Sequence, residues 1–274
     1  MPDGRLDLRV YTYEDISGFE LFCKSGNGVT EILEDSMAER DLRSFGRKRG
    51  RKLSPRQERL LAELLPRVAV DLSSPAPVPL GGLFVRPGPV SDPEGQTPTS
   101  EVWLEIGFGG AEHLVWQAEN NPGVRLIGCE PFEDGVVKAL TAIEGKGLAN
   151  IRLHADDARP LLRWLPANSI SRVFILFPDP WPKKRHAKRR LVSPSLLELL
   201  ARVMRSGAEL RIATDIGDYA RTALLAVTAS PAFRWPAASP AGWRVRGADW
   251  PGTRYEAKAF REGRRSYFFT FIKN

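Results

Sequence analysis

Residues 102–113 read VWLEIGFGGAEH, a short apolar run that leads into a glycine-rich turn. The run predicts a buried strand over 102–106, and the residues from 111 to 120 predict a helix. Two glycines of the turn, Gly107 and Gly109, let the backbone approach a ligand that a β-carbon would keep away. The first N–H groups of the helix and the positive end of its dipole face the same place. This stretch therefore predicts a nucleotide-like binding site at the end of a strand.

The alternation of strand and helix continues along the chain and predicts the fold class. Apolar, β-branched-rich runs predict further strands at 125–129, 151–155, 172–177 and 209–213, and helix-like stretches occupy 131–145, 157–165, 193–206 and 216–229. Repeated strand–helix units indicate an α/β fold with a mostly parallel sheet and helices on both faces. A last run at 267–272 has no helix after it, which predicts an antiparallel C-terminal strand.

Acidic residues surround the glycine turn and indicate which kind of ligand it binds. Glu105 precedes the turn, Glu112 follows it, and Glu130 ends the second predicted strand, 21 residues after Gly109. An acid in the position of Glu130 is placed to accept hydrogen bonds from ribose hydroxyls. Carboxylates beside the turn disfavour a pyrophosphate and suit a ligand with a positive end, such as the sulfonium and amino groups of S-adenosylmethionine. The pattern favours a methyltransferase over a dehydrogenase.

Two further segments follow strand ends at the same predicted edge. Asp156 and Asp157, after the third strand, are placed to accept hydrogen bonds from an adenine amino group, and Asp157 is equally placed to cap the next helix. After the fourth strand, prolines on both sides of Asp179 predict a stiff segment, with Phe177 biased toward an extended conformation. Ligands of open α/β sheets meet the carboxyl ends of the strands, so a second substrate is expected at Asp179.

The positive charge of the chain is concentrated in two segments. The formal net charge is +7, yet residues 40–59 carry nine Arg and Lys against two acids, and residues 183–190 carry six with no acid. These segments together sum to +13, so the remaining residues sum to −6. A mildly acidic body with two basic patches indicates a polyanionic partner, with solvated surface runs as the alternative.

The composition excludes several classes of protein. Of the 274 residues, 42% are hydrophobic and 27% charged, which is ordinary for a globular protein and unlike a disordered or collagen-like chain. There is no apolar run of about 18 residues and no N-terminal secretory pattern, so we expect neither a membrane span nor a signal peptide. Two cysteines and three scattered histidines indicate a reducing cytoplasm and no metal site.

The first hundred residues differ from the regular part of the chain. A short helix is expected to begin at Ser54-Pro55, with Pro66 closing it or lying just after its end. The expected parts of the whole chain are a poorly structured extension at 1–36, a basic arm with the short helix at 37–72, a Pro/Gly-rich insertion at 73–100 and a catalytic domain at 101–274.

The motifs of the regular part resemble those of a known family. They are LEIGFG at 104–109, GCEP at 128–131, ADDA at 155–158, FPDPWPKKRHAKRR at 177–190, ATD at 213–215 and GTRYE at 252–256. Together they resemble the bacterial tRNA (guanine-N7)-methyltransferases, from about residue 40 to the C-terminus. The resemblance implies a Rossmann-like class I methyltransferase fold, S-adenosylmethionine as the cofactor, and methyl transfer to guanine 46 in the variable loop of tRNA.

The resemblance also implies roles for individual residues. Asp179 corresponds to the catalytic aspartate, and Lys183 corresponds to a substrate contact. The cofactor group joins the turn glycines Gly107 and Gly109 with Glu105, Glu130 and Asp157. The acceptor group consists of Asp215, Thr253, Arg254, Tyr255 and Glu256, and the RNA-contacting group consists of Arg185, His186, Lys188, Arg189 and Arg190.

Four features depart from the family pattern. Ala111 stands where many members have a third glycine, and Pro131 follows Glu130 where other residues are common. The Pro-rich insertion at 73–100 and residues 1–36 have no clear counterpart. One hypothesis is that translation starts at Met37, and the intact mass of the protein expressed from its native promoter tests it.

Two other functions stay open. One is an S-adenosylmethionine-dependent methyltransferase that acts on another RNA, and the other is a non-catalytic RNA-binding module on a Rossmann scaffold. Through the resemblance, the acids Glu105, Glu130, Asp157 and Asp179 argue against the second. The sequence leaves a monomer and a homodimer both open.

Overall fold

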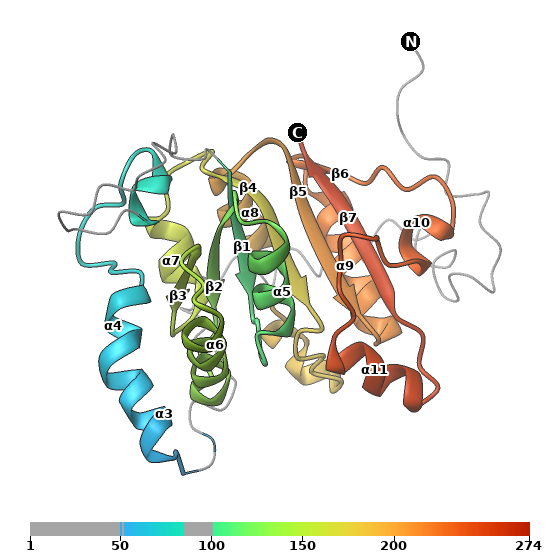
Figure 1. Cartoon of the computed structure of the whole chain (residues 1–274). Helices are drawn as coiled ribbons and strands as arrows, with labels where there is room; N and C mark the ends of the chain where they lie inside the picture. Colours follow the sequence, from blue (N-terminus) through green and yellow to red (C-terminus); the bar gives the residue numbers. More distant parts are fainter. Residues whose placement is uncertain (1–49, 51, 85–100) are drawn as a thin grey trace.

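The computed structural model describes residues 50, 52–84 and 101–274. The extension expected at 1–36, much of the basic segment 40–59 and the second half of the insertion lie outside these residues. From residue 102 onward the chain forms one seven-stranded sheet with helices packed on both faces (Figure 1).

The strands of the sheet lie in the order β3-β2-β1-β4-β5-β7-β6. The parallel strands are β1 (Val102–Ile106), β2 (Arg125–Cys129), β3 (Ile151–His154), β4 (Ile170–Leu176) and β5 (Met204–Thr214). β7 (Tyr267–Lys273) is antiparallel to β5 and to the two-residue β6 (Phe233–Arg234). The predicted parallel sheet and its antiparallel C-terminal strand are confirmed, and β6 alone has no counterpart among the predicted strands.

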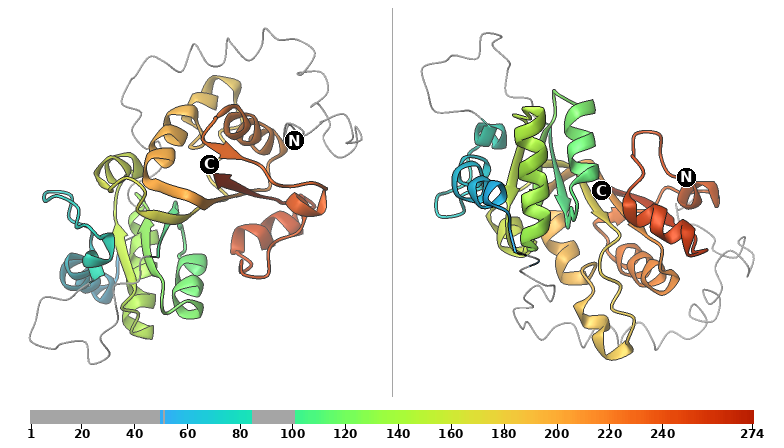
Figure 2. Two further views of the ribbon diagram at one scale, coloured as in Figure 1. Left: turned by 90° about the horizontal axis from the view of Figure 1, so that it is seen from above. Right: turned by 60° about the horizontal axis from the view of Figure 1, so that its bottom comes forward.

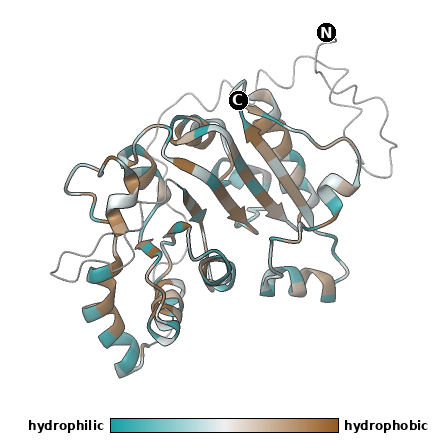
Figure 3. Ribbon diagram, turned by 45° about the horizontal axis from the view of Figure 1, so that its top comes forward, coloured by the Kyte–Doolittle hydropathy of each residue, from teal (hydrophilic) through white to brown (hydrophobic). Residues whose placement is uncertain are grey.

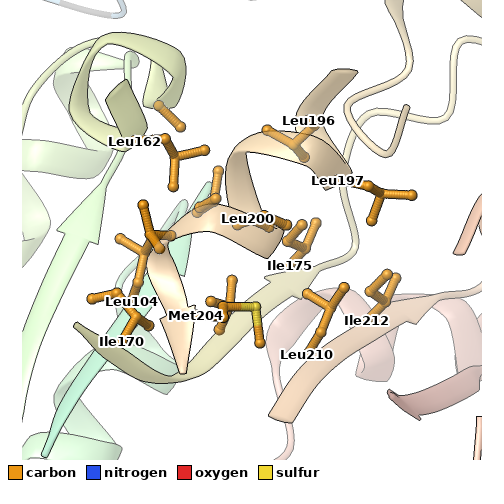
Figure 4. Packing of buried hydrophobic residues seen from close by; sticks show 14 of the residues in the cluster. Leu104, Leu162, Ile170, Ile175, Leu196, Leu197, Leu200, Met204, Leu210 and Ile212 are labelled. Carbon is orange, nitrogen blue, oxygen red and sulfur yellow. The ribbon is translucent and has the colours of Figure 1, made fainter. Parts of the chain in front are cut away.

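Two hydrophobic clusters cover the two faces of the sheet. Leu104 of β1 packs in the cluster formed with α7 (Ala158–Trp164), α8 (Pro194–Val203) and α9 (Gly217–Ala229), part of which Figure 4 shows. Trp103, its neighbour in the chain, packs in the other cluster, with α5 (Glu112–Asn120) and α6 (Glu133–Lys146). Successive side chains of a strand point to opposite faces, so a strand covered on both sides is buried throughout. All five residues of β1 are buried accordingly.

The helix predicted at 193–206 begins as expected and ends three residues early. The Ser193 side chain caps α8 by accepting a hydrogen bond from the Leu196 N–H. Met204 instead starts β5 and pairs with Ile170 of β4, next to an irregularity in the register of the two strands. The apolar spacing runs through this boundary, so hydrophobic periodicity alone does not reveal it.

The helix before the sheet is longer than the sequence predicts. It consists of α3 (Pro55–Arg59), a π-helical turn (Leu60–Leu64) and α4 (Leu65–Val68). The expectation that Pro66 closes the helix or lies just after it is wrong, because Pro66 lies within α4. In the π turn the Leu65 N–H bonds to the Leu60 carbonyl five residues back. This wider turn relieves the clash between a proline ring and the preceding carbonyl, so the helix continues.

This helical segment packs on α6 beside the β3 edge of the sheet (Figure 1). Leu60 is fully buried in the cluster under α6. Arg56 and Arg59 both pair with Glu144 of α6, at 2.9 and 2.6 Å. Two cations of the basic segment 40–59 are therefore already paired within the protein.

The first part of the expected insertion also packs on the domain. A 3-10 helix (Leu80–Phe84) buries Leu80 and Phe84 in the cluster that holds α7. The guanidinium of Arg152 on β3 lies over the Phe84 ring, 4.8 Å from its centroid. This part of the insertion is therefore anchored to the sheet.

Between β6 and β7 the chain makes an excursion that carries α10 (Ala241–Arg244) and α11 (Arg254–Arg261). α10 packs against β7, whereas Ala259 is the one buried residue of α11. Figure 2 shows α11 standing apart from the helices that cover the sheet. Hydrophilic and hydrophobic residues alternate along this short helix (Figure 3). Its exposed position leaves most of its surface available to a partner.

Replacing Leu200 by alanine is expected to lower the free energy of unfolding by about 2–5 kcal/mol, because the side chain is fully buried between α8 and the sheet. Denaturant unfolding measures the change. Glu198 is exposed on the same helix, and its alanine variant should stay within about 0.5 kcal/mol of the wild type. Similar stabilities for the two variants would contradict the assigned packing of α8.

Candidate active site

The turn between β1 and α5 is strongly constrained. Gly107, Gly109 and Ala111 have φ angles of 77°, 53° and 64°, in the left-handed region. Glycine adopts this conformation freely, whereas alanine is strained there. This explains why the third position of the motif favours glycine. Ala111 is held in place because it is buried and its N–H donates to the Phe108 carbonyl at 2.8 Å.

Glu130 holds this turn from the end of β2. Its carboxylate accepts hydrogen bonds from the N–H groups of Gly109, at 2.8 Å, and Phe132, at 2.9 Å. Burial raises the pKa of Glu130; the two N–H groups oppose this shift, and the negative charges of Asp179 and Glu105 add to it. The three carboxylates therefore influence one another, and the ends of β1, β2 and β4 surround one site.

Glu105 is 3% exposed at the end of β1 and is oriented by a buried network. His113 Nδ1 lies 2.7 Å from its carboxylate. The amide nitrogen of Gln117 donates to the Asp249 carbonyl and contacts His113 Nε2, while its amide oxygen accepts from Asn121. This pattern assigns the proton of a neutral His113 to Nδ1, where it is donated to Glu105. The imidazole thus fixes the carboxylate while adding no charge.

Asp157 has the capping role that the sequence allows. Its carboxylate accepts a hydrogen bond from the Arg159 N–H at 2.8 Å, which caps α7, and pairs with the Arg159 guanidinium at 2.7 Å. Asp156 is exposed beside it, and its carbonyl accepts a hydrogen bond from the Cys129 thiol. Burial and the neighbouring acids raise the pKa of Cys129 well above its usual value, so the thiol is neutral and unreactive.

The segment after β4 turns more sharply than expected. Phe177, predicted to be extended before its proline, has a φ of 50° in the left-handed region. Its N–H donates to the Ala213 carbonyl of β5 at 2.8 Å, and its ring faces that of Tyr255. These tertiary contacts override the local preference. Asp179, two residues further along, is exposed.

The basic residues that follow form a short 3-10 helix, η4 (Lys184–Arg189). Arg185 and Lys188 are exposed on it, as expected for RNA contacts. His186 is half-buried with its ring against the indole of Trp181. Desolvation and the cations around it lower the pKa of His186, so the ring is neutral at neutral pH and adds no charge to this surface.

Arg190 is a correction to the expected RNA-contacting group. Its guanidinium is buried, pairs with Asp218 of α9 and donates to the Pro180 carbonyl at 3.1 Å. Arg189, by contrast, is half-buried and lies over the Trp181 ring. A run of like charges does not show which member turns inward. Arg190 is buried beneath the segment of Pro180 and binds its backbone, so its side chain does not face solvent.

The start of α11 lies against the glycine turn. Thr253 caps the helix through its side-chain oxygen. Arg254 pairs with Glu112, in the first turn of α5, at 3.5 Å. A β-carbon placed on Gly109 would lie 3.2 Å from the Tyr255 hydroxyl. The segment expected to bind the acceptor therefore adjoins the turn expected to bind the cofactor.

Two other members of the acceptor group contact arginines. Asp215, after β5, pairs with Arg264 at 2.7 Å, and this hydrogen bond raises the pKa of Arg264. Glu256 accepts from Arg246 through one carboxylate oxygen, while its other oxygen is buried with no hydrogen-bond partner among the described residues. Asp215 thus fastens the chain that follows α11, and Glu256 keeps one acceptor atom unused.

A small pocket joins the two halves of the site. Its lining consists of Glu105, Gly107, Phe108, Glu112, His113, Leu176, Phe177, Thr253 and Tyr255. Two residues of the cofactor group and two of the acceptor group therefore share one pocket. Asp157, Asp179 and Lys183 do not line it.

Several residues of the site are not apparent from the motifs. Phe177 lines the pocket from a left-handed turn that no local pattern indicates. On α11, Lys258 and Arg261 are exposed about one and two turns after Arg254, which already belongs to the expected acceptor group. This spacing after a threonine cap was the available signal for a third basic surface.

The chain matches proteins of known family over most of its length. A family model described as "Putative methyltransferase" matches residues 99–269. A tRNA (guanine-N(7)-)-methyltransferase of Chelativorans sp. (strain BNC1) is 48% identical over 229 residues, which cover 84% of this chain and 94% of the relative. A protein of the same name from Rhodospirillum rubrum is 48% identical over 233 residues, which cover 84% and 88%. The chain belongs to the tRNA (guanine-N(7)-)-methyltransferase family.

The site of this tRNA (guanine-N(7)-)-methyltransferase family member fits S-adenosylmethionine. A β-carbon on Gly107 would meet nothing within 4 Å, so the backbone there faces open space. Glu105 lines the pocket beside it, and Glu130 ends the next strand. Within the described part of the chain, no helix has the length and apolar character to cross a membrane, and no group of three metal-ligating side chains occurs.

Gly135 of α6 packs against the glycine turn that follows β1. A β-carbon there would lie 2.5 Å from the Gly109 carbonyl oxygen and 2.9 Å from Glu130 Cγ. Gly135→Ala should displace the turn and weaken S-adenosylmethionine binding about tenfold or more, as measured by calorimetry. Gly145→Ala, on the same helix with nothing within 4 Å, should bind normally and gain about 0.5–1 kcal/mol of stability. Equal affinities of the two variants would contradict this packing.

Proposed function

We propose that this protein transfers a methyl group from S-adenosylmethionine to N7 of guanine 46 in the variable loop of tRNA. The observation that carries the proposal is the pocket that Glu105 and Gly107 share with Thr253 and Tyr255. Direct transfer between two bound substrates requires such closeness of their binding groups. The names of the curated relatives support tRNA as the partner. The cytoplasm, where tRNA is modified in bacteria, is the proposed location.

The residues around the glycine turn are suited to hold the cofactor. Glu130 retains oxygen lone pairs for the ribose hydroxyls while it accepts the Gly109 N–H. Asp157 is proposed to lie near the adenine, and Glu105 and the Gly107 backbone near the positively charged methionine end. When bound, the cofactor supplies an electrophilic methyl group on a sulfonium.

Methylation of guanine N7 needs no general base, because N7 has an in-plane lone pair and no proton to lose. The protein must hold the guanine in line with the methyl group and stabilise the positive charge that develops on the purine. Asp179 and the unpartnered oxygen of Glu256 are the carboxylate groups proposed for this task. They would also accept hydrogen bonds from the guanine N1–H and amino group, which selects guanine over adenine.

Two cationic surfaces are proposed to hold the tRNA backbone. One is η4, where Arg185 and Lys188 are exposed, and the other is the outer side of α11, where Lys258 and Arg261 are exposed. The first turn of α11 lines the pocket, and η4 follows in the chain the segment of Phe177, which lines the pocket from the end of β4. Phosphate contacts of this kind position an RNA and do not read its sequence.

The test of the proposed function incubates the full-length protein with methyl-labelled S-adenosylmethionine and bulk tRNA, followed by nucleoside analysis. Label in 7-methylguanosine is the expected result. Label in another nucleoside would overturn the proposal in favour of methylation elsewhere in RNA, and absence of label would overturn it in favour of an RNA-binding module.

Asp179→Asn should slow methyl transfer about 10²–10³-fold, because one group that stabilises the developing charge is lost. In single-turnover kinetics the pH profile of the variant should keep the shape of the wild-type profile, with no limb assignable to a catalytic base. Asp71→Asn, which changes an exposed acid before the sheet, is the control and should leave the rate unchanged. A wild-type limb that disappears in Asp179→Asn would show that the carboxylate acts as a base.

Reversing two charges of α11, in the double variant Lys258→Glu and Arg261→Glu, should raise the KM for tRNA about tenfold or more and lower its salt dependence by about one unit of log–log slope for each lost contact. The affinity for S-adenosylmethionine should not change. Arg67→Glu reverses an exposed charge on α4, at the opposite edge of the sheet, and should have little effect. Equal effects of Arg67→Glu and the double variant would show that only overall charge matters.

A further inference from the structure

A buried chain of hydrogen bonds links Glu105 to the segment that precedes α11. His113 Nδ1 lies 2.7 Å from the Glu105 carboxylate, and His113 Nε2 lies 3.1 Å from the amide nitrogen of Gln117. The same nitrogen donates to the Asp249 carbonyl at 2.9 Å. Glu105, His113 and Gln117 are at most 3% exposed, so their polar atoms depend on the protein for hydrogen bonds.

The orientation of the Gln117 amide is fixed from two sides by backbone carbonyls, which only accept hydrogen bonds. The Asp249 carbonyl requires the amide nitrogen opposite it. On the other side, the Asn121 amide nitrogen donates to the main-chain carbonyl of Gln117 at 2.9 Å and to its side-chain oxygen at 3.0 Å. Turning the Gln117 amide over would bring two acceptors together at Asp249 and two donors together at Asn121. The amide therefore has one stable orientation.

This orientation determines which nitrogen of His113 carries a proton. The Gln117 nitrogen is a donor, so Nε2 accepts and carries no proton, and Nδ1 donates to Glu105. The Phe174 ring packs edge-on against the imidazole, with the centroids 4.5 Å apart, and has no lone pair to accept a proton. A proton on Nε2 would be buried without an acceptor, which costs free energy. The ring is therefore kept neutral.

The charged groups near this chain leave the charge of Glu105 uncompensated. The Asp249 carboxylate pairs with Arg211 at 2.9 Å, so only its carbonyl serves the chain. Glu112, in the first turn of α5, pairs with Arg254 at 3.5 Å. Among the described residues, no lysine or arginine pairs with Glu105. The charge of this carboxylate therefore depends on the state of the imidazole beside it.

We propose that Gln117 is a positioning residue for the cofactor: by presenting a donor to His113, it keeps the negative charge of Glu105 available to the positive end of S-adenosylmethionine. This inference rests on the proposed place of that end beside Glu105. Both Glu105 and His113 line the pocket, so a protonated ring would add a positive charge to the same wall and repel the cofactor. Because Asp249 lies in the segment that leads to α11, the acceptor side of the site helps to set the charge of the cofactor side.

The experiment compares two replacements of Gln117 in the full-length protein. Gln117→Glu keeps the shape of the side chain and places a proton acceptor opposite Nε2, whereas Gln117→Leu offers neither donor nor acceptor. Both variants lose the amide nitrogen that holds the Asp249 carbonyl, so a difference between them reports the ring proton and not the loss of that bond. Asn120→Asp adds the same negative charge at an exposed position of α5 and is the control.

Nitrogen-15 NMR of the histidine-labelled protein at neutral pH shows which ring nitrogens carry protons. The chain has three histidines, and the variants His154→Gln and His186→Gln identify the signals of His113 by elimination. Calorimetry measures the affinities for S-adenosylmethionine and S-adenosylhomocysteine, which differ by the methyl group and the positive charge of the sulfonium. Circular dichroism confirms that each variant is folded.

In the wild type, His113 should carry a proton on Nδ1 alone. In Gln117→Glu both ring nitrogens should be protonated, and the affinity for S-adenosylmethionine should fall about tenfold or more. The affinity for S-adenosylhomocysteine should fall about threefold less, because this ligand lacks the sulfonium charge. Gln117→Leu and Asn120→Asp should keep a neutral ring and the wild-type ratio of the two affinities.

A wild-type ring protonated at Nε2 would overturn the proposal, and so would a ring that stays neutral in Gln117→Glu. Equal losses of affinity for the two ligands in Gln117→Glu, or the same losses in Gln117→Leu, would show that Gln117 acts through packing alone and would also overturn it.

These measurements separate the role of Gln117 from the function on which it rests. A protein with the neutral ring and the expected changes in affinity that forms no 7-methylguanosine in tRNA retains the role of Gln117 and contradicts the proposed function. A protein that methylates guanine N7 with His113 protonated on both nitrogens contradicts the role of Gln117 and retains the function.

Discussion

The site depends on one stretch of backbone being held in a conformation that it does not adopt by itself. Ala111 is strained in the left-handed region, and Gly107 and Gly109 precede it in the same region. Burial of β1 on both faces fixes the start of this turn, the Glu130 carboxylate binds its middle, and Gly135 of α6 approaches it closely. Each of these three contacts prevents the turn from moving to a less strained conformation. The ligand-facing backbone is thus fixed before any ligand arrives, which reduces the ordering cost of binding.

The carboxylates of the site have two kinds of hydrogen-bond partner. Some are paired with a cation, and others accept only from uncharged donors and so keep their negative charge. Asp157 is paired with a guanidinium, which offsets its charge. Glu105 receives a hydrogen bond from a neutral imidazole, and Glu130 receives two from backbone N–H groups. Neutral donors orient a carboxylate and leave its charge in place. Asp179 stays in contact with water. In the proposed reaction, a crevice of this kind attracts a cationic donor and tolerates a cationic product.

Most strands of the sheet could be predicted from the sequence. Several local conformations could not, because tertiary contacts determine them. Strands β1 to β4, β7 and the second half of β5 were predictable because each is a short apolar run. The continuation of the helix through Pro66 was not predictable, because a π turn has no signature in the local sequence. Arg190 was indistinguishable in the sequence from its exposed neighbours, because burial depends on Asp218 of a distant helix. The left-handed turn at Phe177 likewise depends on a bond to another strand.

Both sides of the pocket are fastened to the same place, the carboxyl end of β5. The Phe177 N–H is bonded to the Ala213 carbonyl, and two residues further on Asp215 pairs with Arg264, beyond the end of α11. β5 is the longest strand and lies between β4 and β7, away from the edges of the sheet. If the two sides of the pocket were bound to different strands, the distance between them would change whenever the twist of the sheet changed. Two sides of a pocket that are bound to the same strand move together. The distance between them therefore changes little when the edge strands of the sheet fluctuate.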